Sequence, residues 1–291
     1  MEQPLVSVIT ITRNRGKLIG RCIASVLGQT YKNIEYIIVD GAYDDNTDEV
    51  VASFNDARIR FVKLETNWPI KETLDYGISL CNGKYISFLD SDDEYLPDKI
   101  EKQVDLIESL QEEYGLVYCW MTYFDNESMA QLSVHRANLR GDVRDDVIGD
   151  SVISGTPTLM FRRELLEQLN GWKSQDEIGI ISDWELCARA CQITKVDYVP
   201  ESLVNVYVNH GSVRQSDTAY YHNLYERSIV FSKYFLSEFA SNFGRYPQQA
   251  FSHYWTIFLC SIKLGRYFQG VKYMIKAFLS APKSFAIKLL R

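Results

Sequence analysis

Apolar and polar residues alternate along the first third of the chain in a pattern that predicts strands and helices in succession. Four short apolar runs rich in β-branched residues predict strands that are covered on both faces. These runs span residues 5–11, 34–39, 59–64 and 85–89. Between them, apolar residues recur at intervals of three and four, as in amphipathic helices, at residues 18–27, 46–54 and 72–81. The alternation predicts right-handed βαβ units and an α/β fold with an open, mostly parallel, Rossmann-like sheet flanked by helices.

The pattern beyond residue 95 is less regular. We predict a helix at 96–110, an apolar, aromatic stretch at 116–124 and a loop or short hairpin in the polar segment 126–150. A strand at 159–161, a helix to 169, a helix at 183–191, strands at 196–199 and 203–208, and helices from about 218 complete the prediction.

Polar residues follow three of the predicted strands. These segments are Thr12-Arg13-Asn14, Asp40-Gly41 and Asp90-Ser91-Asp92. Parallel strands bring their carboxyl ends to one edge of a sheet, and ligands bind beyond that edge. We therefore expect the three segments to converge on a binding site.

Asp90, Asp92 and Asp93 place three carboxylates within four residues, directly after an apolar strand. An Asp-x-Asp arrangement suits a hard divalent cation, Mg²⁺ or Mn²⁺, which takes carboxylate oxygens and shares its other positions with water and phosphate. The alternative is an ordinary acidic turn in front of the helix that Pro97 begins, where the helix dipole favours negative charge.

The composition fits a soluble protein with a full core. The chain has 291 residues, 46% of them hydrophobic, enough for one large domain or a domain with an appended subdomain. No apolar run approaches the roughly 18 residues of a membrane span, and no basic region followed by an apolar one opens the chain. We expect a cytoplasmic protein. Six cysteines without metal-binding spacing predict reduced, buried thiols.

Charge is divided unevenly along the chain. The formal net charge is −7, yet the residues after Glu238 include eight basic and no acidic ones. Apolar residues at helical spacing from Trp255 to Phe278 fit a helical hairpin that packs on the rest of the protein. Because the polar face is exclusively basic, we expect the tail to attach peripherally to an anionic membrane surface, on its inner face. The acidic remainder argues against a nucleic acid partner.

Four segments together resemble the family 2 glycosyltransferases with the GT-A fold. They are Val6–Arg15, Val39–Thr47, Asn82–Asp93, and Gly171-Trp172 with Ser182–Leu186, and the resemblance covers roughly residues 5–216. It implies transfer of a sugar, with inversion, from a nucleotide diphosphate donor. It also implies a catalytic domain at 1–215, with a nucleotide-binding half at 1–95 and an acceptor half at 96–215, followed by a helical, basic extension at 216–291.

The resemblance assigns the nucleotide site to strand-end residues. It implies nucleotide binding by Ile11, Thr12, Arg13, Asn14, Asp40, Lys71, Asp90 and Ser91. Asp40 matches the position that contacts the uracil ring, which favours a UDP-sugar. Arg13 stands where family members often have a tyrosine that stacks on the base, and a guanidinium plane can stack as well. Gly41 stands where many members have a second aspartate.

The same resemblance implies a metal site. Asp92 is expected to be the main ligand of Mn²⁺ or Mg²⁺, together with Asp90 and with His210, whose imidazole is an acceptable ligand for Mn²⁺. The metal would act as a Lewis acid on the departing diphosphate.

Asp183 is the candidate catalytic base implied by the resemblance. It matches the aspartate that takes the proton of the attacking hydroxyl, although Ser182 replaces the usual acidic neighbour. As a residue at a helix start it also fits a plain N-cap. Trp184, on the acceptor side, can stack on a sugar or fill the core.

Two functions remain open from the sequence. The leading hypothesis is a metal-dependent, inverting hexosyl- or N-acetylhexosaminyltransferase that acts on a glycan acceptor, lipid-linked, in surface polysaccharide synthesis. The alternative is a catalytically silent module that binds sugar nucleotides or assists assembly, because Arg13, Gly41 and Ser182 depart from the family pattern. A nucleotidyltransferase is disfavoured by the absence of a glycine-rich phosphate loop after the first strand. The oligomeric state stays open.

Overall fold

The structure, a computed structural model, describes residues 3–41, 45–153, 155–180, 182–208 and 218–290. The chain divides into two compact units. The first comprises residues 1–142, 153–172 and 189–211, and the second comprises 143–152, 173–188 and 212–291. The second unit therefore takes in two segments that precede the domain boundary predicted at residue 215, and the boundary itself stays a prediction.

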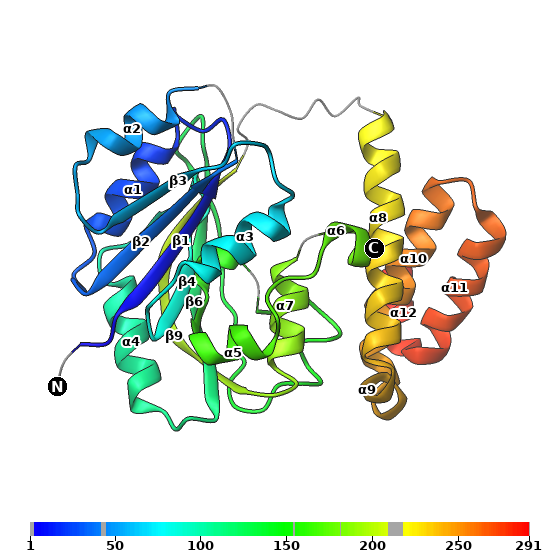
Figure 1. The fold of residues 1–291 in the computed structure, drawn as a ribbon. Coiled ribbons are helices and arrows are strands. Elements are labelled where there is room, and N and C mark those ends of the chain that lie inside the picture. The colour runs from blue at the N-terminus through cyan, green and yellow to red at the C-terminus, as the bar shows by residue number, and fades with distance from the viewer. Residues whose placement is uncertain (1–2, 42–44, 154, 181, 209–217, 291) are drawn as a thin grey trace. The chain divides into compact units, whose positions relative to one another are not determined.

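One nine-stranded sheet forms the centre of the first unit (Figure 1). Its strands are β1 (Val6–Thr12), β2 (Ile34–Asp40), β3 (Ile59–Lys63), β4 (Tyr85–Phe88), β5 (Glu94–Tyr95), β6 (Tyr114–Asp125), β7 (Gln131–His135), β8 (Met160–Arg162) and β9 (Lys195–Val208). The strand order is β3-β2-β1-β4-β8-β6-β9-β5, and β7 pairs with β6. The first four strands are mutually parallel, whereas β8 is antiparallel to both of its neighbours. The α/β class with a parallel, Rossmann-like half is confirmed.

Helices cover both faces of this sheet. They are α1 (Ile19–Leu27), α2 (Thr47–Ser53), α3 (Ile70–Ser79), α4 (Lys99–Ser109), the short α5 (Arg163–Gln168) and a 3₁₀ turn, η1 (Thr156–Thr158). Alternate residues of β1 point to opposite sides, because side chains alternate along a strand. Val8 joins the core beneath α1 and α4, whereas Ile9 lies against Gly77 of α3. Burial on both faces explains why the first strands are continuous apolar runs.

The less regular half of the chain differs from the prediction in detail. The two strands predicted at 196–199 and 203–208 are one strand, β9, which pairs in parallel with β6 through register shifts near Trp120. The predicted hairpin in the polar stretch is formed by β6 and β7. The two-residue strand β5 carried no sequence signal and pairs with β9. All six cysteines are buried and free, as predicted.

The second unit is helical. Its elements are α6 (Gln175–Ile178), α7 (Asp183–Ala190) up to residue 188, α8 (Thr218–Glu238), α9 (Ala240–Arg245), η2 (Pro247–Ala250), α10 (Phe251–Lys263), α11 (Tyr267–Ser280) and α12 (Pro282–Leu289). Helix α10 packs on α8 and on α11. Ile229, Ile257 and Cys260 form one apolar cluster, and Phe251, Ala277 and Ala281 form another. Among the described residues, no helix combines the length and the apolar character that crossing a membrane requires.

Candidate active site

Parallel pairing brings the polar ends of β1, β2 and β4 together. Thr12 lies opposite Asp40 in the β1–β2 register, and the Gly41 N–H donates a 2.8 Å hydrogen bond to the Thr12 carbonyl. On the other side of β1, the Leu89 N–H donates to the Ile9 carbonyl at 2.9 Å. The segment that follows β4 therefore leaves the sheet at the same edge. We call Thr12, Asp40, Asp90 and Asp92 the strand-end site.

Asp40 is the most unusual member of this site. Its side chain is fully buried, yet neither carboxylate oxygen has a hydrogen-bond partner among the described residues, and the same holds for the hydroxyl of Thr12. Burial raises the pKa of Asp40, and the charge of Lys63 on β3 opposes that rise. Buried polar groups are nearly always hydrogen-bonded. Two orphaned side chains side by side therefore indicate a place where a ligand supplies the missing donors.

The loop after β1 carries three other predicted nucleotide residues. Ile11 is half-buried, whereas Arg13 and Asn14 are exposed. Asn14 has a positive φ of 54°, a conformation that asparagine tolerates better than most residues. The Gly16 N–H donates to Oδ2 of Asp45 at 2.9 Å, which ties this loop to the loop after β2.

The acidic segment after β4 is held by two arginines. Asp90 is exposed, Ser91 is buried, and the side chain of Asp92 is 19% exposed. Nη1 of Arg15 lies 3.4 Å from Oδ2 of Asp92. Nη2 of Arg21 donates to the Asp92 carbonyl at 2.5 Å. No local sequence pattern links either arginine to the acidic run, because Arg21 lies 71 residues before Asp92 and Arg15 lies further away still.

Asp93 differs from its acidic neighbours because it is buried. It accepts a 2.9 Å hydrogen bond from the Tyr207 N–H of β9, and the Arg21 guanidinium lies 3.4 Å from the centre of the Tyr207 ring. Burial raises the pKa of Asp93 to about 8, and the charge of Asp90 adds to the rise. Asp93 thus fastens the acidic segment to β9.

These carboxylates fit a divalent cation that takes most of its ligands from water and phosphate and not from the protein. The described residues contain no group of three or more acidic, histidine or cysteine side chains that could hold a metal by themselves. Asp90 is exposed and Asp92 is partly exposed beside Arg15, whereas Asp93 is buried and accepts a hydrogen bond from β9. Mg²⁺ and Mn²⁺ sites of this kind use one or two carboxylates and complete their shell with water and phosphate oxygens. His210 lies outside the described residues.

A buried lysine supports β4 beneath this segment. Lys99 is fully buried, its ammonium donates to Oγ of Ser87 at 2.5 Å, and it lies 4.1 Å from the centre of the Tyr95 ring. The Tyr95 hydroxyl in turn donates to the Phe88 carbonyl. Burial lowers the pKa of Lys99 to about 7. The end of β4 that leads to Asp90 is therefore fixed by polar contacts inside the core.

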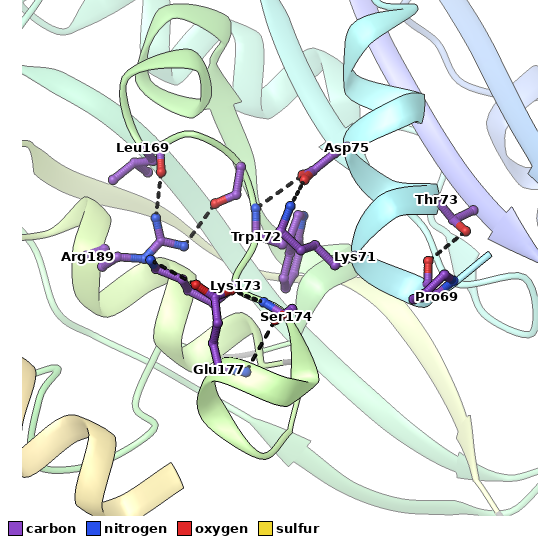
Figure 2. Close-up of polar contacts among 11 residues, drawn as sticks. Pro69, Lys71, Thr73, Asp75, Leu169, Trp172, Lys173, Ser174, Glu177 and Arg189 are labelled. Atoms are coloured by element: carbon purple, nitrogen blue, oxygen red, sulfur yellow. Dashed lines mark hydrogen bonds and ion pairs between the residues drawn. The ribbon is translucent and has the colours of Figure 1, made fainter. Parts of the chain in front are cut away.

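Lys71 lies in the first turn of α3, within a polar cluster that Figure 2 shows. Its ammonium is 2.5 Å from Oδ2 of Asp75, and Oδ1 of Asp75 accepts the Trp172 N–H at 3.3 Å. Gly171 has a φ of +65°, and a Cβ there would lie 2.2 Å from Oδ1 of Asp75. The cluster therefore explains why a glycine precedes Trp172 and gives Lys71 a partner on its own helix.

Asp183 and Trp184 begin helix α7 in the second unit. The Trp184 N–H donates to Oδ1 of Asp183 at 2.7 Å. The Trp184 indole N–H donates to the Val147 carbonyl, and its ring stacks on His253 at 5.2 Å between centroids. Phe235 also contacts it, at 4.7 Å. These contacts place Trp184 in an aromatic cluster, while its role at an acceptor stays a prediction.

Comparisons with known proteins agree with this architecture. The model of the family described as glycosyl transferase family 2 matches residues 7–169. An uncharacterized glycosyltransferase of Rickettsia typhi is 38% identical over 125 residues, which are 43% of this chain and 39% of that protein. The putative glycosyltransferase EpsE of Bacillus subtilis is 31% identical over 194 residues, 64% of this chain and 66% of EpsE. The chain thus matches about two fifths of the first of these relatives.

Two solved structures share the fold. S. aureus TarS in complex with UDP-GlcNAc superposes with a TM-score of 0.63 at 14% identity, covering 94% of this chain and 91% of that one. The mannosyltransferase PcManGT from Pyrobaculum calidifontis, in complex with GDP-Man and Mn²⁺, gives a TM-score of 0.63 at 15% identity, covering 99% and 83%.

Proposed function

The chain belongs to glycosyl transferase family 2 and has the GT-A fold, and from this premise we propose that it transfers a sugar from a UDP-sugar to a glycan acceptor. The observation that carries the proposal is the buried carboxylate of Asp40, whose two oxygens lack donors among the described residues. A uracil ring offers an N–H of the kind that this carboxylate needs, and pairing it would recover the cost of burial. Thr12, opposite Asp40, would take a second polar contact of the nucleotide.

The acidic segment would receive the diphosphate. Asp92, Asp90 and the predicted ligand His210 would hold Mn²⁺ or Mg²⁺, which supplies charge neutralisation for the departing diphosphate. Support for a metal comes from the exposed Asp90, from the Asp92 carboxylate, which is 19% exposed beside Arg15, and from the Mn²⁺ in the PcManGT complex. Arg13, Asn14 and Ser91 would contact the nucleotide from the loops around them. Lys71 would reach the diphosphate only by leaving its contact with Asp75.

Asp183 would act as the general base. In an inverting transfer, the acceptor hydroxyl oxygen forms a bond to the anomeric carbon while the bond from that carbon to the diphosphate oxygen breaks. The hydroxyl proton passes to the Asp183 carboxylate, and the electron pair of the broken bond leaves with the nucleoside diphosphate. Proton transfer to a positioned carboxylate contributes roughly 10²–10⁴ in rate. Trp184 would lie at the acceptor side, and the acceptor would be a lipid-linked glycan in surface polysaccharide synthesis.

A second candidate is a silent module that binds the sugar nucleotide without transferring it. The ion pair between Arg15 and Asp92 favours it, because a guanidinium at 3.4 Å already compensates the carboxylate that a metal would use. The departures at Arg13, Gly41 and Ser182 point the same way.

Donor hydrolysis and donor binding distinguish the two candidates. We expect the protein to release UDP slowly from a UDP-sugar with Mn²⁺ present, and its melting temperature to rise with the donor by mass action. Asp183→Asn should lower UDP release about 100-fold or more while the donor-induced thermal shift is retained. Asp176→Asn, an exposed acid on α6, is the matched control. A thermal shift without UDP release in the unmodified protein would support the silent module, and full activity of Asp183→Asn would contradict the assigned base.

A further inference from the structure

Helix α11 exposes an apolar face that its own unit leaves uncovered. Phe268 is 90% exposed and Leu279 is 70% exposed, with Ile275 half-exposed between them. These three positions are seven and four residues apart, so they lie on one side of an α-helix. Nine of the nineteen large apolar side chains that are exposed among the described residues fall between 267 and 290. Scattered exposed apolar residues are ordinary, but a concentration of this kind marks an interaction surface.

The opposite side of α11 provides the packing that the fold needs. Gly270 and Ala277 are buried there, and a Cβ on Gly270 would lie 2.7 Å from Cδ1 of Ile262 on α10. Tyr273 contacts Tyr254 of α10 at 6.1 Å between ring centroids. The sequence pattern suggested a single apolar stripe that packs inward. The structure instead gives α11 an inner apolar face that is packed and an outer one that is not.

Helix α12 continues the exposed apolar surface. Phe285 packs inward, edge-on to Phe278 and Trp255. On the other side of α12, Ile287 is 55% exposed and Leu290, just after its last turn, is 89% exposed. We call Phe268, Val271, Ile275 and Leu279 of α11 and Ile287 and Leu290 at α12 the tail face.

The charges around the tail face have one sign. Lys272 and Lys276 are exposed and border the outer face of α11, and Lys283 and Lys288 are exposed on α12. No acidic residue occurs after Glu238. Arg266 differs from these lysines, because its charge is paired with Glu226 of α8. Among the described residues none of these four lysines forms an ion pair, although the Lys276 ammonium lies 5.2 Å from the centre of the Tyr273 ring. The apolar strip is therefore bordered by positive charge without acidic partners in the described chain.

We propose that the tail face docks on an anionic lipid bilayer, with its apolar side chains in the headgroup region and its lysines against the lipid phosphates. An anionic bilayer supplies an apolar layer and negative charge together, which is the combination that this surface lacks. A second copy of the chain would place like-charged lysines against one another, because a symmetric contact repeats the same patch on both sides. The bilayer is therefore the occupant that the charge pattern favours.

Vesicle co-sedimentation of the full chain tests this inference without any donor, so its failure would leave the transfer proposal untouched. The chain should sediment with vesicles of phosphatidylcholine mixed with phosphatidylglycerol and remain in solution with phosphatidylcholine alone. Phe268→Ser with Leu279→Ser should weaken binding about tenfold or more, because the inserted apolar area is lost. Lys272→Glu with Lys276→Glu should weaken it at least as much, most strongly at low salt.

Two matched controls keep the test specific. Leu132→Ser removes an exposed apolar side chain of the first unit, and Lys233→Glu reverses an exposed charge on α8. Neither should change sedimentation by more than about twofold, and unchanged thermal unfolding verifies that every variant folds. Equal binding to neutral vesicles, or full binding by both double variants, would overturn the proposal. So would a dimer in analytical ultracentrifugation that Phe268→Ser dissociates, since the tail face would then be a contact between copies.

Discussion

The strand-end site and the tail face break the usual rules of folding in opposite ways. At the strand ends, Asp40 and Thr12 bury polar atoms that have no partner among the described residues. On α11, Phe268 and Leu279 expose apolar side chains that have no cover. An isolated fold gains nothing from either arrangement. Under our two proposals, each region is completed by something outside the chain, a polar ligand in one case and an apolar, anionic surface in the other.

The largest expected effect concerns the strand-end site. Asp92→Asn keeps the shape of the side chain but removes a negative charge from the acidic segment. We expect turnover of a UDP-sugar to fall on the order of 10³-fold, about 4 kcal/mol in the activation barrier, and the dependence on Mn²⁺ concentration to shift to higher values. Steady-state kinetics across a Mn²⁺ titration provide the measurement. Asp105→Asn, an exposed acid of α4, is the control, and wild-type turnover in Asp92→Asn would remove the strand-end site from the mechanism.

The second prediction compares two apolar side chains of the helical tail. Ile257 of α10 is fully buried, whereas Phe268 is 90% exposed. Ile257→Ala should lower the free energy of unfolding by about 3 kcal/mol because it leaves a cavity. Phe268→Ala should change it by less than about 0.5 kcal/mol, since the side chain contributes little to folding. Urea denaturation of both variants measures the difference. Equal destabilisation would mean that Phe268 is covered in solution.

The third prediction concerns Lys99, which is buried beneath the strand-end site. Burial lowers the pKa of its ammonium from 10.5 to about 7, so the unfolded chain binds more protons than the folded chain between these values. The loss of folding stability caused by burying Lys99 is therefore greatest below about pH 7, and it declines as the pH rises toward 10. Lys99→Met should therefore stabilise the protein by about 2 kcal/mol at pH 6, and the gain should shrink at pH 9. Denaturant unfolding at both pH values tests this, with the exposed Lys32→Met as a control; a gain independent of pH would show that the pKa of Lys99 is not lowered in the folded protein.

The smallest expected effect concerns Asp40, where one substitution should change the stability of the fold and the affinity for UDP in opposite directions. Asp40→Asn removes the buried charge but keeps its volume. Without donor, the variant should gain stability relative to the unmodified protein as the pH rises from about 4 to 7, because burial raises the pKa of Asp40 and the folded state resists its ionisation. With UDP present, affinity should fall about tenfold, or about 1.4 kcal/mol. Calorimetry at pH 7 measures the affinity, and undiminished UDP binding would mean that Asp40 does not contact the base.

The sequence predicted the parallel half of the fold closely because periodicity is clearest there. The run at 34–39 became β2, which ends at Asp40, and the helix predicted at 72–81 became α3 at Ile70–Ser79. The predictions were weaker where tertiary pairing decides the structure. Strand β9 continues through Pro200 because the irregular register of β6 accommodates it, and β5 is only two residues long. The local pattern of apolar and polar residues does not indicate which strand β5 or β9 pairs with.

The sequence predicted where the residues of the candidate site lie in the fold better than it predicted which residues they contact. The strand ends that carry Thr12, Asp40 and Asp90 were expected to converge, and parallel pairing follows from the alternation of elements. The hold of Arg21 on the Asp92 carbonyl and on the Tyr207 ring could not be read from the sequence. These residues are far apart in the chain, and only the completed sheet brings β9 to the acidic segment. The structure likewise revealed the second apolar face of α11, because spacing alone does not say which side a neighbour covers.

The register of β1 against β2 constrains how this chain can change over evolutionary time. Thr12 and Asp40 face the same edge only while seven residues of each strand stay paired in their present order. Deleting one residue within β2 would turn every later side chain to the opposite face and carry the carboxylate away from its hydroxyl neighbour. Length variation inside β2 would therefore remove the nucleotide contact that we propose for Asp40 in a single event, whereas surface loops tolerate changes in length far better.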